Sequence, residues 1–271
     1  MEHATELAVI RKWLFDWPDA PWLMTGTTAT AWFAPSPELL AAVLGTRLRD
    51  VAHPDRLARI RFYDVGFAGA TAEGYLGHDA GRFREAVVAF PSSVGDVQGE
   101  ISTFMWTDSD AYQEWGREGF GWPLRRASFV LSGPLWTQAH DHGESSAGDG
   151  FEAQGVATAE FEGGSISLSV DDFEGWRGSG ASPEPSPGIP LWITPRRVTP
   201  SDRSEPSVIE ITAVEPRVLK PGIRRNVRAA GSVEMEAGHP LHGLLPDIVT
   251  AEVHTGFELE VGRSVRVLER W

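Results

Sequence analysis

The sequence contains no cysteine, and lysine occurs at only two positions, Lys12 and Lys220, among its 24 basic residues. The absence of cysteine excludes disulfide bonds, thiolate metal ligands and cysteine nucleophiles. The scarcity of lysine restricts any chemistry that needs a reactive amine to two places in the chain. Arginine supplies the other basic side chains, and because it stays protonated at any working pH it cannot act as a nucleophile in place of lysine.

Basic charge and long apolar runs are also scarce. The formal net charge of the 271-residue chain is −14, and an acidic surface disfavours nucleic acid and anionic membranes as partners. No run approaches the roughly 18 apolar residues that a membrane-spanning helix needs, and the first residues do not resemble a signal peptide. We therefore expect a cytoplasmic protein that binds a small molecule and neither nucleic acid nor membrane.

Short runs with alternating apolar residues, which are typical of β-strands, dominate what is present. They include LARIRFYDVGF (57–67), REAVVAF (84–90), GEISTFMW (99–106) and ASFVLSGPLW (127–136), and they resume in the last quarter of the chain. A hairpin is expected at Gly163-Gly164, and short helices are expected over 4–15, 36–45 and 108–118. The pattern predicts a mainly β (α+β) protein, an antiparallel barrel or sandwich decorated by a few helices.

The stretch GSGASPEPSPG (178–188) is rich in glycine, serine and proline, which favours an irregular loop. Similar strand-like runs lie on both sides of it, so we expect a single domain over 1–271 in which 178–188 forms a flexible loop or a lid. His140 and His142 alternate on an extended stretch, but a glycine-rich turn offers them no third ligand. We therefore expect neither a metal nor a cofactor.

The stretch GREGFGWPLRRASF (116–129) resembles the active-site segment of the acetoacetate decarboxylase family. The family pattern is G-R-E, two residues, G, an aromatic residue, P and a pair of lysines, and the residues that match it are Gly116, Arg117, Glu118, Gly121, Trp122 and Pro123. Residues 20–44 and 239–271 are similar to the family's opening and closing segments. The resemblance implies a closed, cone-shaped antiparallel β-barrel with a few short helices, assembled as a homo-oligomer.

The sequence departs from the family pattern at the lysine pair. In the family the first lysine forms a Schiff base with the substrate ketone and the second lowers its pKa, whereas here Leu124 and Arg125 stand in their places. Leucine cannot form an imine. Lys12 on its expected helix and Lys220 before Pro221 lack the desolvated pocket that a reactive lysine needs. The resemblance therefore implies an enzyme that works without an imine.

The other site residues follow from the resemblance one position at a time. Arg125 is expected to polarise a carbonyl or hold an enolate or carboxylate, and Glu73 is expected to move a proton. Arg117 and Glu118 are expected to support the loop as an ion pair. The substrate pocket is expected to be lined by Tyr63, Phe104, Trp106, Phe120, Trp122 and Leu124.

Three functions are open for such a pocket. The favoured one is a lyase of the cyclase or isomerase type that acts on a polyketide-like or other polarised carbonyl substrate in natural-product biosynthesis, where a pericyclic ring closure needs shape more than a nucleophile. The second is a decarboxylase, hydratase or dehydratase of a small keto acid, with Arg125 in place of the lysine pair. The third is a non-catalytic small-molecule-binding barrel. An elongated apolar pocket favours the cyclase, and a small polar pocket favours the keto-acid enzyme.

Overall fold

The computed structural model describes residues 21–44, 57–71, 74–75, 81–138, 152–172, 192–198, 208–244, 246–261 and 265–270. The strands are β1 (Trp22–Phe33), β2 (Ala58–Thr71), β3 (Gly74–Tyr75), β4 (Gly81–Val94), β5 (Val97–Thr107), β6 (Leu124–Arg126), β7 (Ser128–Ser132), β8 (Gly155–Phe161), β9 (Gly164–Asp172), β10 (Trp192–Val198), β11 (Val208–Val214), β12 (Arg217–Lys220), β13 (Ile223–Met235), β14 (Ile248–Val261) and β15 (Val265–Arg270). The helices are α2 (Pro37–Leu44), α3 (Asp110–Trp115), the π-helical turn η1 (Gly116–Phe120) and α4 (Pro134–Gln138).

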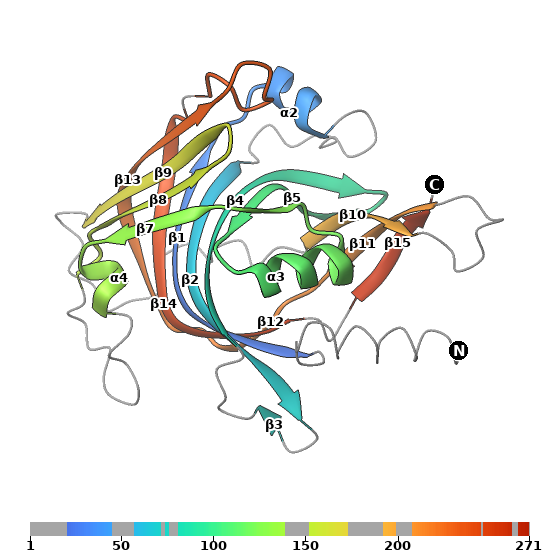
Figure 1. Ribbon diagram of the computed structural model, residues 1–271, viewed down its shortest axis with the longest axis horizontal. Coiled ribbons are helices and arrows are strands. Elements are labelled where there is room, and N and C mark those ends of the chain that lie inside the picture. Colours follow the sequence, from blue (N-terminus) through green and yellow to red (C-terminus); the bar gives the residue numbers. More distant parts are fainter. Residues whose placement is uncertain are drawn as a thin grey trace.

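The strands form one large sheet that curves strongly around its own concave face (Figure 1). Its order is β15-β11-β10-β5-β4-β2-β1-β14-β13-β9-β8-β7, and β12, β3 and β6 attach to β14, β2 and β5. The pairings are antiparallel except where β5 meets β6 and β10. The mainly β class is therefore confirmed. Within the described residues β15 and β7, at the two ends of this order, are not paired with each other, so closure of the barrel stays a prediction.

Local sequence signals place the helix starts and the hairpin as expected. Ser36 accepts a hydrogen bond from the Leu39 amide at 3.1 Å at the start of α2, and Ser109 accepts one from the Tyr112 amide at 3.2 Å at the start of α3. The β8–β9 hairpin turns through Gly163, whose φ of 86° favours glycine. The expected helix over 4–15, the pair His140 and His142 and the loop 178–188 lie outside the described residues.

Both faces of the central strands are buried, each against its own group of apolar side chains. Ile60 and Phe62 of β2 belong to the larger core cluster, whereas Tyr63 and Val65 belong to the smaller core cluster. Because side chains alternate along a strand, each central strand contributes to both clusters. The candidate site lies beside the smaller one. Among the helices that the structure describes, none combines the length and apolar character needed to cross a bilayer.

Candidate functional site

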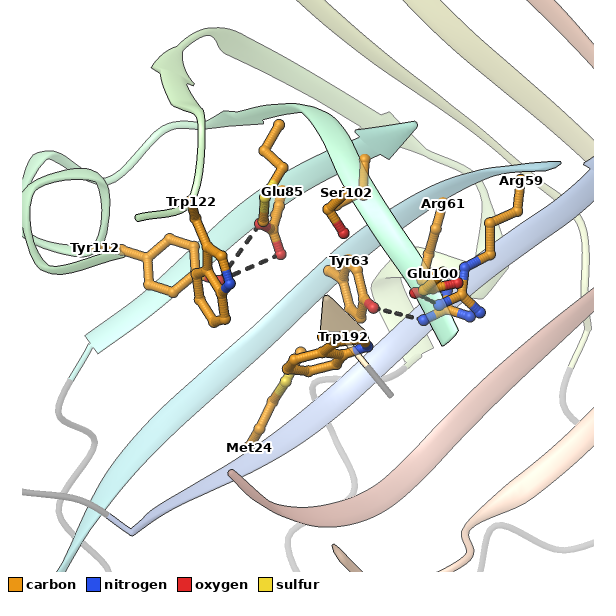
Figure 2. A pocket seen from close by; sticks show the side chains of 12 residues that line it. Met24, Arg59, Arg61, Tyr63, Glu85, Glu100, Ser102, Tyr112, Trp122 and Trp192 are labelled. Atoms are coloured by element: carbon orange, nitrogen blue, oxygen red, sulfur yellow. Dashed lines mark hydrogen bonds and ion pairs between the residues drawn. The ribbon is translucent and has the colours of Figure 1, made fainter. Parts of the chain in front are cut away.

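A pocket beside the smaller core cluster contains about 450 Å³ of space, part of which is open to solvent. Only a small part of this space is wide enough for a water molecule, so the clear interior is narrow. Figure 2 shows an acidic group at one end of the pocket and two guanidinium groups at the other. The lining residues are Met24 of β1, Arg59, Arg61 and Tyr63 of β2, Glu85 and Val87 of β4, Glu100, Ser102 and Met105 of β5, Tyr112 of α3, Trp122, and Trp192 of β10.

Glu85 is the acidic group at the first end. It lies on the same face of β4 as Phe83 and Val87 and is 3% exposed. The Tyr112 hydroxyl donates to its two carboxyl oxygens at 3.4 and 3.5 Å. Burial raises the pKa of Glu85 to about 8, against the smaller lowering effects of the Tyr112 hydrogen bond and the charge of Arg61. At neutral pH Glu85 is therefore mostly a neutral acid that can give up a proton.

The two guanidinium groups at the other end have different partners. Arg59 is buried and forms an ion pair with Glu100, and burial, followed by the nearby charge of Arg61, lowers its pKa. The Nε of Arg61 donates to Thr30 Oγ1 at 2.8 Å, and its Nη1 donates to Tyr63 Oη at 2.6 Å. Among the described residues no carboxylate lies within ion-pair distance of Arg61. Its charge can therefore bind an anionic ligand.

A β-bulge at Thr103 decides which side chains of β5 face the pocket. The antiparallel pairing passes from Ala89 opposite Ser102 to Val88 opposite Phe104, so Thr103 is an extra residue on β5. One extra residue reverses the alternation of side chains beyond it. Ser102 therefore points into the pocket, whereas Phe104 packs against the larger core cluster.

The bulge also explains the positions of the next two side chains. Trp106 belongs to the larger core cluster and stacks on Phe161, with ring centroids 4.4 Å apart. Phe104 stacks on Trp106 at 6.2 Å. Met105, which lies between these two aromatic residues in the sequence, lines the pocket instead. Phe104 and Trp106, both expected in the pocket, are thus placed on the opposite face of the sheet.

Leu124 and Arg125 fall on different faces of the sheet. Strand β6 runs parallel to β5, with Leu124 beside Met105 and Arg125 beside Trp106. Leu124 is 1% exposed and belongs to the smaller core cluster, which backs the pocket, although it does not itself line it. Arg125 is exposed, and burial together with the charge of Arg125 lowers the pKa of His239. The structure places Arg125 outside the pocket, because adjacent residues of a strand point to opposite faces.

The remaining motif residues shape the turn that carries Trp122 into the pocket. Gly121 has a φ of 74°, and the Trp122 amide donates to the Gly116 carbonyl at 3.0 Å. A Cβ atom at Gly116 would lie 2.3 Å from Leu124 Cδ1, so glycine is needed for this close approach. Phe120 stacks on Trp122 with centroids 4.6 Å apart and is not one of the lining residues. The backbone conformation therefore explains Gly121, and close packing explains Gly116.

Of the other expected residues, Tyr63 and Trp122 line the pocket, and Arg117 is exposed. Glu73 and the side chain of Glu118 lie outside the described residues, so the proton-transfer role of the first and the ion pair of the second stay predictions.

The lysines give no support to an imine at this pocket. Lys12 lies outside the described residues. The side chain of Lys220 is 63% exposed and forms an ion pair with Glu258 at 3.8 Å. No lysine is among the lining residues that the structure describes. The position that corresponds to the Schiff-base lysine in the resemblance is occupied by Leu124.

Sequence reasoning missed the four charged groups of the pocket, which are Arg59, Arg61, Glu85 and Glu100. A signal for Glu85 exists, because it alternates with Phe83 and Val87 and so falls on an apolar face. The arginines of β2 alternate with apolar residues of the larger cluster, a pattern that ordinarily indicates a solvated face. Only the packing of the neighbouring elements shows that this face lines a pocket.

No family model and no curated protein matches the sequence. Solved structures do match over nearly the whole chain. The enduracididine biosynthesis enzyme MppR, complexed with the condensation product of pyruvate and imidazole 4-carboxaldehyde, is 13% identical with a TM-score of 0.64, covering 93% of this chain and 90% of that one. An acetoacetate decarboxylase-like enzyme from Sphingomonas wittichii RW1 is 16% identical with a TM-score of 0.64, covering 93% of both chains.

Acetoacetate decarboxylase from Legionella pneumophila is 14% identical with a TM-score of 0.56, covering 94% of this chain and 90% of that one. Identities this low establish the fold and leave the chemistry to be argued from the site. The chain therefore has the fold of the acetoacetate decarboxylase-like enzymes.

Proposed function

We propose that this chain is an enzyme that removes water from, or adds water to, a small oxo acid by general acid catalysis without an imine. The observation that carries the proposal is the presence, in one narrow pocket, of the buried acid Glu85, whose pKa is raised to about 8 by burial, and of Arg61, which pairs with no carboxylate in the described part of the chain. The first can supply a proton to a carbonyl oxygen, and the second can hold a carboxylate.

Arg61 is suited to position the substrate. Its hydrogen bonds to Thr30 and Tyr63 fix the guanidinium group, and a fixed guanidinium binds a carboxylate with directed hydrogen bonds. Holding the carboxylate at this end directs the rest of a short substrate toward Glu85 at the other end (Figure 2). Positioning of this kind contributes to catalysis because the reacting groups meet in the required orientation.

The chemistry can be followed for water loss from a 4-hydroxy-2-oxo acid. The substrate loses a proton from C3 to water while the carbonyl oxygen takes the Glu85 proton, which gives an enol. The enol proton then returns to the Glu85 carboxylate as the carbonyl re-forms. The electron pair of the enol C2–C3 double bond then forms the C3–C4 double bond. The C4 hydroxyl leaves and combines with the proton released in the first step to give water. The reverse sequence adds water to the unsaturated acid.

The lining of the pocket supports one of the functions that the sequence leaves open, the one that acts on a small oxo acid. A narrow pocket with charged groups at both ends favours a small oxo acid over an elongated polyketide-like substrate. An arginine that holds the substrate carboxylate stabilises its negative charge, which opposes its loss as CO₂. The similar enzyme MppR has been solved in complex with pyruvate, a 2-oxo acid, which supports this class of ligand.

The proposal is tested by NMR from the exchange of the C3 protons of pyruvate in D₂O, because exchange requires the enol. Wild-type protein is expected to accelerate exchange, and Glu85→Gln is expected to abolish the acceleration while pyruvate still binds. Glu258→Gln, outside the pocket, is the matched control and should exchange like wild type. Binding of pyruvate without exchange indicates a non-catalytic barrel. A covalent adduct after borohydride treatment contradicts the imine-free mechanism.

A further inference from the structure

The guanidinium end of the pocket carries two cations and one anion. Arg59 and Arg61 lie two residues apart on the same face of β2, and Glu100 from β5 pairs with Arg59. At neutral pH the acid at the other end is mostly uncharged. The charges of the lining side chains therefore sum to a single positive charge, which is contributed by Arg61.

The Arg59–Glu100 pair is closed off from water. The side chains of Arg59 and Glu100 are 7% and 11% exposed. Trp192 of β10 is paired with Glu100 where β10 runs parallel to β5, and its side chain lines the same pocket (Figure 2). In surroundings of this kind a charge that loses its partner is not stabilised by solvent.

We propose that Glu100 is a specificity-determining residue that limits the pocket to ligands with one carboxylate, by occupying Arg59 and leaving only Arg61 for the ligand. This inference rests on the proposed function, because it takes Arg61 as the group that holds the substrate carboxylate. Glu100 itself needs no contact with the reacting atoms.

The selectivity follows from the cost of an unpaired buried charge. A ligand with two carboxylates must either leave its second carboxylate without a cation or displace Glu100 from Arg59, and each outcome leaves one buried carboxylate unpaired. A ligand in which an amide replaces the second carboxylate avoids this cost at nearly the same size. Glu100 therefore discriminates against ligands with two carboxylates, because it leaves no cation for the second carboxylate.

The test compares malonate with its monoamide, malonamate, by isothermal titration calorimetry at neutral pH, with pyruvate as the reference ligand. Wild-type protein is expected to bind malonamate at least about tenfold more tightly than malonate. Glu100→Gln frees Arg59 and is expected to reverse this preference, again by about tenfold or more. Glu258→Gln removes a carboxylate outside the pocket and should keep the wild-type preference.

A double variant guards against misfolding of the single variant. Arg59→Met combined with Glu100→Gln removes both members of the pair, leaves no unpaired buried charge, and is expected to bind malonamate more tightly than malonate, as wild type does. Equal binding of both ligands by wild type overturns the inference without any variant. If the single variant folds and keeps the wild-type preference, the inference is also wrong, whereas failure of pyruvate to bind wild type refutes the proposed function itself.

Discussion

The buried acid Glu85 makes the stability of the protein depend on pH in a direction opposite to that of an ordinary paired carboxylate. Its pKa is raised from 4.5 to about 8 in the folded state. Between these values the folded state holds a proton that the unfolded state has lost, so the free energy of unfolding falls as the pH rises. The loss begins near the unfolded pKa and is complete above the folded pKa.

The size of the effect follows from the two pKa values. Each pH unit between 4.5 and about 8 lowers the free energy of unfolding by about 1.4 kcal/mol, which gives a total on the order of 5 kcal/mol. Glu85→Gln keeps a neutral, hydrogen-bonding side chain and removes this titration. The variant is therefore expected to gain stability relative to wild type by up to about this amount between pH 5 and pH 9.

Chemical denaturation at several pH values across this range measures the difference between wild type and Glu85→Gln. Glu258→Gln is the control for the loss of a carboxylate, because Glu258 is more than one-third exposed and lies in an ion pair outside the pocket. Its curve should run parallel to that of wild type. A difference between wild type and Glu85→Gln that stays constant from pH 5 to pH 9 would refute the assignment of Glu85 as a buried neutral acid.

Two further predictions concern the motif position and the first strand. Leu124→Lys places an amine in the smaller core cluster, where Leu124 is 1% exposed, and we expect the free energy of unfolding to fall by roughly 3 kcal/mol. Because burial lowers the pKa of a lysine, we also expect this amine to form an adduct with pyruvate, which borohydride traps and mass spectrometry detects. No adduct in a folded variant would show that a longer side chain at this position, which only backs the pocket, does not reach into it. Gly26 has a φ of 153°, and a Cβ atom at this position would lie 2.3 Å from the Asp64 carbonyl oxygen. Gly26→Ala is therefore expected to lower the free energy of unfolding by more than about 2 kcal/mol, measured by denaturant unfolding. An unchanged unfolding midpoint contradicts this geometry of β1.

Much of the fold could be predicted from local patterns. The alternation in 57–67 and 84–90 corresponds to strands β2 and β4, and the capping serines correspond to the starts of α2 and α3. These features depend on a few neighbouring residues and so can be read along the chain. The resemblance of the segment 116–129 to a family motif also predicted the fold. The glycines of this motif lie in a turn whose backbone conformation and close packing require glycine.

The site could be predicted only in part, because the face of the sheet to which a side chain points depends on the register of strand pairing. Tyr63 and Trp122 were expected in the pocket and line it, whereas Phe104 and Trp106 are turned away by the extra residue Thr103. No feature of the sequence GEISTFMW marks where a bulge falls. The bulge is fixed by the pairing of β5 with β4, which joins residues far apart in the chain.

The sequence by itself determined the strand-rich class and the limits on imine and thiol chemistry, since the chain has two lysines and no cysteine. Tertiary structure alone decided which side chains share the pocket and what charge they carry. Burial in the folded chain raises the pKa of Glu85 to about 8, and the folded chain pairs Glu100 with Arg59. Burial and pairing arise from contacts between distant segments, which no local pattern specifies.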